Sequence, residues 1–418
     1  MVATGADRRS CTTWQFDTDA VCIPLVSSTG HGKKSLNYVH YQSGKFALGT
    51  ILAAVIPKNP SVLRTRFLHL YLSHFRDTVL VPLMKGAANV SLSMKEIASV
   101  EIPVPPLDEQ QNLINLIFRI EDEYRELLRE NNHQADLLKQ LRKAVLQDAV
   151  EGKLTAEWRN QNQMMKGDPQ YDAAALLVQI KAEKERLVKA GKIKKEKPFP
   201  PITESNKSFD LPYGWVRCRL GETVESMTNG IYKPAQFYSD IGTPSIRMYN
   251  IQDGYLDFSK ISRMILTHDE LANYALKPGD LLVNRVNSRE LVGKAALVRD
   301  LREVTVYEAM NIRIRFIEKG NLPRFANLYF RTNYVRGIFQ NIAKQASGQV
   351  SINQPQVASI LFPLPPLSEQ QAIVARVDNL MATIDELEKQ VSGRKEQAQM
   401  LMQAVLREAF NGGAANGN

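Results

Sequence analysis

A set of arginine, asparagine and lysine side chains falls on short, strand-like stretches in the second half of the chain. An arginine can donate two parallel hydrogen bonds to guanine, an asparagine can pair similarly with adenine, and a lysine can hold a phosphate. These residue types favour a surface that reads nucleic-acid bases, although the same residues also occur on ordinary protein surfaces. The candidates are Arg247, Tyr249, Asn250, Arg285, Asn287, Lys294 and Asn311.

Motifs that carry catalysis or hold a cofactor are missing from the sequence. No G-x-x-x-x-G-K-[ST] loop, G-x-G-x-x-G turn, H-E-x-x-H helix or N-P-P-[YF] stretch occurs, and the 6 histidines show no ligand spacing. The cysteines, Cys11, Cys22 and Cys218, have neither the number nor the spacing of a disulfide framework or a zinc site. We expect a non-catalytic protein with no catalytic, cofactor-binding or metal residues of its own.

Composition and charge narrow the class of protein further. At 418 residues the chain predicts at least two domains, and 44% hydrophobic residues is a value typical of globular proteins. The net charge of +9 and the pI near 9.3 favour a polyanionic partner. No run of eighteen apolar residues and no signal-peptide pattern occurs, which predicts a cytoplasmic protein without membrane contact.

The chain contains a long internal repeat. Residues 90–152 align without a gap with residues 350–412 at an offset of 260, and 19 of these 63 positions are identical. The shared residues include a P-x-P-P-L-x-E-Q-Q core, and similarity of this extent indicates a duplication. The prolines favour extended backbone, and Asp108 and Ser368 are suitable N-cap residues before a helical pattern. We expect each P-P-L stretch to end a domain and start a helix.

Each copy of the repeat predicts one long amphipathic helix, at 108–152 and at 368–412. Apolar residues recur at alternating spacings of four and three, which is typical of a coiled-coil seam. We expect the two helices to bury these seams against each other, with Asn131, Gln134 and Arg394 helping to fix the register. Packing of each helix on its own domain is the alternative. The seam positions include Leu113, Ile117, Ile120, Tyr124, Leu127, Leu138, Leu141, Val145, Ile373, Val377, Leu380, Ile384, Leu387, Val391, Ala398, Leu401 and Val405.

The segment 211–367 predicts a globular α/β or β-rich domain. Its β-rich runs are TPSIRMYNI, GDLLVNRV, AALVRD and NIRIRFI, separated by turns. Residues 211–360 hold nineteen Lys/Arg against thirteen Asp/Glu. A basic linker, 161–210, precedes the domain and is helical from Asp172. We interpret its lysine-rich stretch as a solvated charge run, with a dedicated phosphate contact as the alternative.

The first domain, 1–107, extends the duplication. Residues 19–33 match residues 280–294 without a gap, so the segment 211–279 has only residues 1–18 opposite it. We expect the first domain to lack its N-terminal part and the second to be the more complete of the two.

Taken in order, these features resemble the DNA-specificity subunit of type I restriction-modification enzymes. The features are the tandem domains, the P-P-L-x-E-Q stretches, the long helices, G-K-L-T-x-x-W-R at 152–159 and L-P-x-G-W at 211–215. The resemblance covers residues 19–412. It implies an α/β (α+β) fold in which two globular target-recognition domains are separated by two long antiparallel coiled-coil-like helices. Each domain would read one half of a bipartite, asymmetric site in double-stranded DNA, and the helices would measure the gap.

The resemblance also implies partner subunits that carry the chemistry. Two methyltransferase subunits would bring S-adenosylmethionine, and restriction subunits would use ATP and Mg, so that no cofactor belongs to this chain. The central region, 108–160, and the second helix, 368–412, would form the spacer and part of the methyltransferase docking surface, followed by a flexible tail, 413–418. The partner-binding and spacer residues would include Leu127, Leu141, Val145, Leu387, Leu401 and Val405.

Two other classes of function remain open from the sequence. The chain could be a helical scaffold whose globular ends bind proteins and which has no DNA specificity, although the basic second domain argues against this. A stand-alone modifying enzyme is disfavoured by the missing cofactor motifs. A gel shift with DNA separates the first alternative from DNA recognition, and S-adenosylmethionine binding by the isolated chain would support the second.

Overall fold

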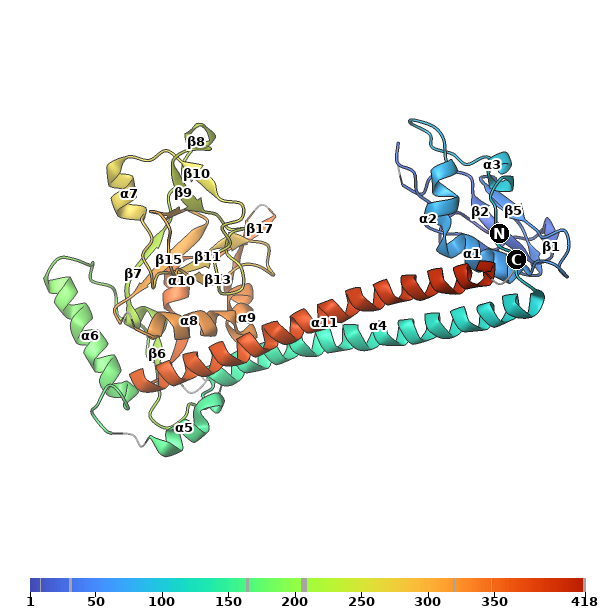
Figure 1. Cartoon of the computed structure of the whole chain (residues 1–418). Helices are drawn as coiled ribbons and strands as arrows, with labels where there is room; N and C mark the ends of the chain where they lie inside the picture. Colours follow the sequence, from blue (N-terminus) through green and yellow to red (C-terminus); the bar gives the residue numbers. More distant parts are fainter. Residues whose placement is uncertain are drawn as a thin grey trace. The chain divides into compact units, whose positions relative to one another are not determined.

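The chain folds into two compact units that share two long helices. The computed structural model describes residues 1–7, 9–29, 32–162, 165–203, 209–318, 320–346 and 348–415, without the side chains of residues 346 and 411–415. The first unit contains Met1–Ala135 and Lys389–Asn418, and the second contains Asp136–Glu388. The elements of each unit are labelled in Figure 1.

The two long helices are α4, Leu107–Val150, and α11, Leu367–Ala415. Both begin one residue before the expected position, so Asp108 and Ser368 lie in the first turn, and the expectation that they are N-caps is wrong. A glutamine two residues further on instead joins the first turn to the preceding proline in both helices. The Nε2 group of Gln110 donates to the carbonyl of Pro105 at 2.7 Å, and that of Gln370 donates to Pro365 at 2.9 Å.

The ends of the helices also differ from the expectation. Helix α4 stops at Val150, because Gly152 adopts a left-handed conformation with φ of 71°. A Cβ atom at Gly152 would lie 2.6 Å from Cγ of Pro212, so this close approach requires glycine. Two short helices follow, a 3-10 turn at Lys153–Thr155 and α5 at Ala156–Gln161. Helix α11 includes residues 413–415 of the expected tail, and residues 416–418 lie outside the described residues.

The first unit is a small α/β domain. Its three-stranded antiparallel sheet has the order β3-β2-β5, and β1 pairs separately with β4. The strands are β1 Phe16–Asp17, β2 Ala20–Pro24, β3 His40–Gln42, β4 Lys45–Phe46 and β5 Leu52–Val55. The short helices are α1 Thr65–His74, α2 Arg76–Val79 and α3 Met94–Ala98.

Both long helices complete the core of the first unit. Phe67 of α1 packs in one apolar cluster with Ile117 of α4 and with Leu406 and Phe410 of α11. Further along the pair, Nη1 of Arg394 donates to Oε1 of Gln134 at 3.3 Å. The early part of α4 therefore faces the late part of α11, and the helices run antiparallel within this unit.

The second unit contains four sheets. Their strand orders are β14-β9-β10-β8, β13-β11-β15-β7, β12-β17-β16 and β18-β6. The bounds of the strands are β6 Val216–Arg219, β7 Val224–Asn229, β8 Tyr238–Ser239, β9 Thr243–Ile246, β10 Ser262–Met264, β11 Leu281–Asn284, β12 Val286–Asn287, β13 Ala295–Leu297, β14 Val306–Tyr307, β15 Asn311–Phe316, β16 Lys344–Ala346, β17 Gln349–Ser351 and β18 Leu361–Leu364.

The helices of the second unit pack on different parts of this unit. They are α6 Ala173–Lys189, α7 His268–Tyr274, α8 Leu322–Arg331, α9 Asn333–Ile342 and α10 Gln354–Ala358, labelled in Figure 1. Helix α8 packs on β13 of the central sheet, and its Arg324 forms an ion pair with Asp378 of α11. Among the helices of the described residues, none combines the length and the apolar character needed to cross a membrane.

The basic linker is less solvated than expected. Lys184 donates to the carbonyl of Gly221 at 2.6 Å and pairs with Glu196, while Lys181 pairs with Glu222. These contacts hold α6 against the start of the globular domain, so the interpretation as a purely solvated charge run is wrong for these two lysines.

Candidate nucleic-acid interface

The guanidinium group of Arg247 is held in a fixed orientation at the end of a strand. Arg247 follows β9, which pairs in parallel with β14, and Glu308 follows β14 directly. The Nε atom of Arg247 lies 3.0 Å from Oε1 and 3.1 Å from Oε2 of Glu308, whose carboxylate is largely buried. Neither Nη group is bonded to Glu308. The outer edge of the guanidinium therefore remains open to a planar acceptor pair.

Two tyrosine rings flank this guanidinium. The guanidinium carbon of Arg247 lies 5.5 Å from the ring centroid of Tyr238 and 5.6 Å from that of Tyr249. The hydroxyl of Tyr238 donates to Glu308 at 2.8 Å, and burial together with this hydrogen bond raises the pKa of Tyr238 to about 12. Tyr249 is 44% exposed and lies at the rim. The two rings restrict the arginine further and lower the entropy that a ligand would have to remove.

A cavity of about 510 Å³ lies in front of Arg247. Its rim carries exposed side chains that the sequence analysis did not single out, since Tyr232 is 77% exposed and Met310 is 40% exposed. Gln349, at the start of β17, supplies an amide on the same lining. Aromatic faces, a guanidinium fork and an amide are the groups that stack on and hydrogen-bond to nucleic-acid bases.

The buried asparagines build this site but do not face a ligand. Asn250 is 1% exposed, its amide nitrogen donates to the carbonyls of Asp257 and Lys260, and its oxygen accepts from the backbone N–H of Arg247 at 2.9 Å. Both amide groups of Asn250 are thus used inside the domain, and its contact with a base stays a prediction. Its side chain fixes the turn that carries Arg247.

A chain of three amides supports the opposite wall. Asn287 donates to Asn284 at 2.7 Å, Asn284 donates to Asn311 and to the carbonyl of Met310, and Asn311 donates to the carbonyl of Ile246. Asn287 is 9% exposed, and Asn311 is fully buried. Both amide groups of Asn287 are also used inside the domain, and its contact with a base likewise stays a prediction.

Arg285 lies between β11 and β12, and Lys294 directly precedes β13. Nη1 of Arg285 donates to the carbonyl of Ala309 at 3.2 Å, which supports the loop of Met310. Lys294 is half-buried, burial lowers its pKa, and it has no ion-pair partner within the described part of the chain. Of the seven candidate residues, Arg247 and Tyr249 thus line the open cavity, and Arg285 supports it from behind.

The seam of the long helices is buried at some positions and exposed at others. Val145 is 5% exposed, whereas Leu127 is 45%, Leu141 46%, Leu387 39% and Leu401 66% exposed. The expectation that all of these residues bury against the opposite helix is therefore wrong for the four leucines. Val405 is intermediate, and Leu138, Ile373, Val377 and Ile384 are buried as expected.

A groove of about 930 Å³ lies along the first unit's part of this open stretch. It contains Leu127 and Leu401, together with Asn131, Gln134 and Arg394 at the polar seam positions. The hydrogen bond from Arg394 to Gln134 confirms that these polar residues pair across the seam. An apolar groove rimmed by polar side chains is typical of a protein-binding surface.

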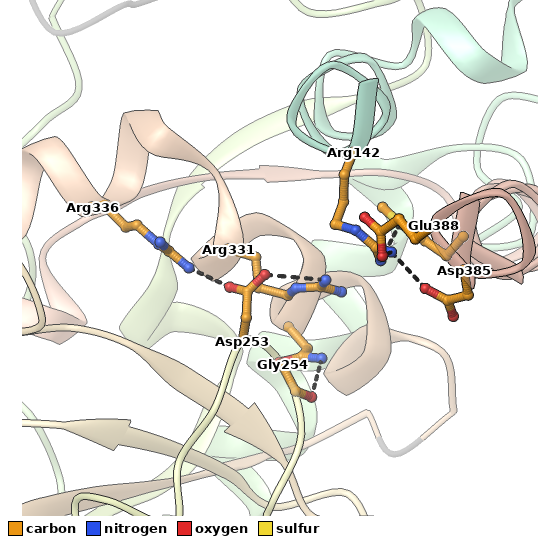
Figure 2. A network of polar contacts seen from close by, with 9 residues as sticks. Arg142, Asp253, Gly254, Arg331, Arg336, Asp385 and Glu388 are labelled. Atoms are coloured by element: carbon orange, nitrogen blue, oxygen red, sulfur yellow. Dashed lines mark hydrogen bonds and ion pairs between the residues drawn. The ribbon is translucent and has the colours of Figure 1, made fainter. Parts of the chain in front are cut away.

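In the second unit, polar side chains join the two long helices near the exposed leucines Leu141 and Leu387. Arg142 of α4 donates to Asp385 at 2.5 Å and to Glu388 at 3.0 Å, both on α11 (Figure 2). In the same view Asp253 accepts from Arg331 and Arg336, which hold the turn at Gly254 against α8 and α9. One guanidinium bound to two carboxylates fixes the helix register without apolar contact.

The three motifs that flank the second unit meet at one buried carboxylate. Glu369, in the P-P-L-S-E-Q-Q stretch, is 1% exposed. It accepts from Nε1 of Trp215 at 2.7 Å, from Oγ1 of Thr155 at 2.7 Å, and from the guanidinium of Arg159. This network joins the start of α11 to the L-P-Y-G-W and G-K-L-T-A-E-W-R segments, and sequence alone did not predict the contact. Within the described ranges, no group of three His, Cys, Asp or Glu side chains is placed to hold a metal ion.

The fold and the cavity define a class of duplicated, basic proteins that combine α/β domains, an open cavity lined by Arg247 and tyrosines, and a pair of long helices. The family model for the type I restriction modification DNA specificity domain matches residues 11–135 and 212–394, and the chain belongs to this family. The resemblance inferred from the sequence is thereby confirmed.

The relatives agree with this assignment. The chain is 27% identical over 350 residues to the type I restriction enzyme EcoKI specificity subunit of Escherichia coli strain K12, covering 82% of this chain and 65% of that protein. The chain spans less than two thirds of the length of that curated relative and of the next two, with 45% and 44%.

Solved structures share the fold. A chain from a study of complex assembly and conformational transition of the type I R-M system gives a TM-score of 0.61 at 17% identity, covering 96% of this chain and 84% of that one. The HsdS subunit from Thermoanaerobacter tengcongensis gives 0.55 at 17% identity, with 96% and 82% covered. The α/β architecture with two long helices is thereby confirmed.

Proposed function

We propose that this chain is the DNA-specificity subunit of a type I restriction-modification enzyme and reads a bipartite, asymmetric site in double-stranded DNA. The observation that carries the proposal is Arg247, whose guanidinium is oriented by Glu308 and flanked by two tyrosines at an open cavity within the matched domain. The alternative of a helical scaffold without DNA specificity is not favoured, because the chain belongs to a DNA-specificity family.

The geometry supports direct reading of a base by Arg247. Its Nη groups make no hydrogen bond to Glu308 and can donate to O6 and N7 of a guanine in the major groove, and the Glu308 pair removes the need to order the side chain on binding. Tyr232 and Tyr249 can pack on the neighbouring base or sugar at the rim. The net charge of +9 supports additional contacts to phosphates, which makes binding fall steeply with salt.

The chain is proposed to be non-catalytic and to work in the cytoplasm with partner subunits. Two methyltransferase subunits would supply S-adenosylmethionine, and restriction subunits would supply ATP hydrolysis with Mg. The exposed leucines Leu127, Leu141, Leu387 and Leu401 on the long helices support a role in docking the methyltransferase subunits, since exposed apolar side chains at seam spacing can accept further helices.

The test is to express the chain with its cognate methyltransferase subunit in a methylation-free host and to map modified adenines across the genome. We expect one bipartite asymmetric motif, and Arg247→Ala should relax the specificity of one half of it while leaving the other half intact. Methylation without any sequence preference would refute the proposal. Equal loss at both halves would show that Arg247 maintains folding and does not read a base.

A further inference from the structure

The charged side chains around the cavity in front of Arg247 are matched by partners of opposite sign. Arg247 pairs with Glu308, and Nζ of Lys233 lies 2.5 Å from a carboxylate oxygen of Glu270. Lys233 is also held over the ring of Phe237, 4.5 Å from its centroid. The other described side chains of the lining carry no charge. A phosphate needs unmatched positive charge, so this cavity suits the neutral edges of bases better than the DNA backbone.

Met310 exposes an apolar side chain at this cavity. It lies in the turn between β14 and β15, two residues after Glu308, and it is 40% exposed. Because Glu308 orients the guanidinium of Arg247, one turn fixes both the arginine and the methionine. The two side chains line the same cavity of about 510 Å³. A ligand that Arg247 binds there therefore lies within reach of Met310.

The backbone around Met310 is fixed by hydrogen bonds. The carbonyl of Met310 accepts from the backbone N–H of Arg285 at 2.8 Å and from Nδ2 of Asn284 at 3.1 Å. The turn itself is closed by the backbone N–H of Asn311, which donates to the carbonyl of Glu308 at 3.0 Å. Isolated apolar side chains are common on protein surfaces. Here, however, a rigid backbone presents an adaptable thioether side chain at a cavity, which is what a specific contact requires.

The chemistry of the major groove identifies the group that fits Met310. Thymine is the base that carries a methyl group there, and this methyl group makes apolar contacts with protein side chains. Cytosine at the same place presents an amino donor, which a thioether satisfies only weakly. The base pair that holds the guanine of Arg247 contains no thymine. Since base pairs stack about 3.4 Å apart, the thymine within reach of Met310 belongs to the neighbouring pair.

We propose that Met310 is a specificity-determining residue, which packs on the C5-methyl group of a thymine in the base pair next to the guanine read by Arg247. Arg247 supplies the polar contact and Met310 the apolar one, so that the second unit reads a step of two base pairs. The inference rests on the proposed DNA-specificity function and adds to it the chemical group that is read beside the guanine.

The test removes the methyl group from the DNA and leaves the hydrogen-bonding groups of the base in place. Duplexes with the mapped site are made with deoxyuridine instead of thymidine, at one position at a time, in the half-site that Arg247→Ala relaxes. Their dissociation constants with the complete methyltransferase complex are measured by fluorescence anisotropy. At one thymine, next to a guanine, deoxyuridine should weaken binding about fourfold, which is the effect expected from one buried methyl group.

Variants of the protein assign this loss to Met310. Met310→Ala should bind the thymine and the deoxyuridine duplexes equally well, because the contact with the methyl group is then absent from both. Met310→Leu keeps an apolar side chain of similar volume, so it should retain most of the preference for thymine. Met94→Ala is the matched control, since Met94 is an exposed methionine of the first unit, and it should preserve the whole preference.

A mapped half-site without a T·A pair beside a guanine would overturn the proposal, because Met310 would then have no methyl group to contact. Binding that deoxyuridine weakens at no position would overturn it too. A deoxyuridine loss that persists in Met310→Ala would assign the methyl contact to another residue, and the proposal would be wrong. In each of these cases the complex still prefers its site, so only the role of Met310 fails. Loss of all sequence preference in the wild-type complex would instead refute the proposed function itself.

Discussion

The first turns of the two long helices share a sequence motif, but the side chains of this motif make different hydrogen bonds. In both copies the first glutamine of P-P-L-x-E-Q-Q donates to the carbonyl of the first proline of P-P-L, because Gln110 and Gln370 lie one turn away along the same chain. The preceding glutamate behaves differently. Glu369 is buried under Trp215, Thr155 and Arg159, whereas Glu109 remains partly exposed without a partner among the described residues. A duplicated motif thus keeps the contacts that it makes within itself and loses those that depend on distant segments.

The largest expected effect is on Glu369. Glu369→Ala leaves the guanidinium of Arg159 and the indole of Trp215 without their buried acceptor, which should destabilise the second unit by about 3–5 kcal/mol. Hydrogen exchange of the β6 and β18 amides, or urea unfolding followed by tryptophan fluorescence, measures this change. Glu109→Ala is the matched control and should alter the first unit by less than about 0.5 kcal/mol. Similar losses in both variants would show that the difference between the two glutamates is not real.

Acid should lower the stability of the first unit. His69 of α1 contacts the carbonyl of Val39 through Nε2 at 3.1 Å, and burial lowers its pKa from 6.5 to about 4. The unfolded chain therefore takes up a proton near pH 6.5, which the folded unit accepts only near pH 4. Stability should fall across this window by about 3 kcal/mol in total. Helix α8, which follows the central sheet of the second unit, contains no histidine, so this helix has no group equivalent to His69.

The measurement is hydrogen exchange of β2 and β5 amides at pH 7 and pH 4.5, corrected for the intrinsic exchange rates. His69→Phe should remove most of the loss within this window. An unchanged pH dependence in that variant would assign the effect to other titratable groups. Glu121 would be the next group to replace, because its interaction with His74 lowers its pKa.

The sequence predicted those parts of the fold that depend on neighbouring residues. The strand-like runs TPSIRMYNI, GDLLVNRV, AALVRD and NIRIRFI contain β9, β11 with β12, β13 and β15, and both long helices start at the P-P-L stretches. Alternation and proline chemistry act over a few residues, so a pattern can reveal them. Arg247 and Tyr249 were proposed in the same way, from residue type on a predicted strand, and the structure shows that both line one cavity.

Contacts that join distant segments could not be found from the sequence. Glu109 and Glu369 have identical local contexts, and only the fold shows that one of them meets Trp215. The same limit applies to Asn250 and Asn287. An asparagine can bond to a base or to an acceptor inside the protein, and only the fold shows that the carbonyls of Asp257 and Lys260 lie beside Asn250 and that the amide of Asn284 lies beside Asn287.

Replacing Gln110 and replacing Gln370 should lower stability by different, moderate amounts. Gln110 donates to Pro105 and Val62, and its oxygen accepts from the backbone N–H of Arg64 at 2.8 Å. Gln370 makes only the bond to its proline, and its buried oxygen has no partner in the part of the chain that the structure describes. Gln110→Ala should therefore cost about 2 kcal/mol in the first unit and Gln370→Ala about 1 kcal/mol in the second. Hydrogen exchange of the first turns of α4 and α11 measures both, and an equal cost would contradict the comparison.

The smallest expected change is in DNA binding, where Arg247 is compared with the neighbouring Tyr249. Arg247→Ala removes the guanidinium fork and should weaken binding of the complete methyltransferase complex to its site by about tenfold, or ~1.4 kcal/mol. Tyr249→Phe keeps the ring beside Arg247 and removes only the hydroxyl that contacts Ser262, so binding should change by less than about threefold. Titrations at two salt concentrations separate base reading from phosphate contact, because a residue that only contacts phosphate changes the salt slope. An altered salt slope with unchanged base preference in Arg247→Ala would assign this arginine to the DNA backbone. Base reading by the second unit would then depend on the other groups around the cavity. Gln349 and Tyr232 are the residues to replace next.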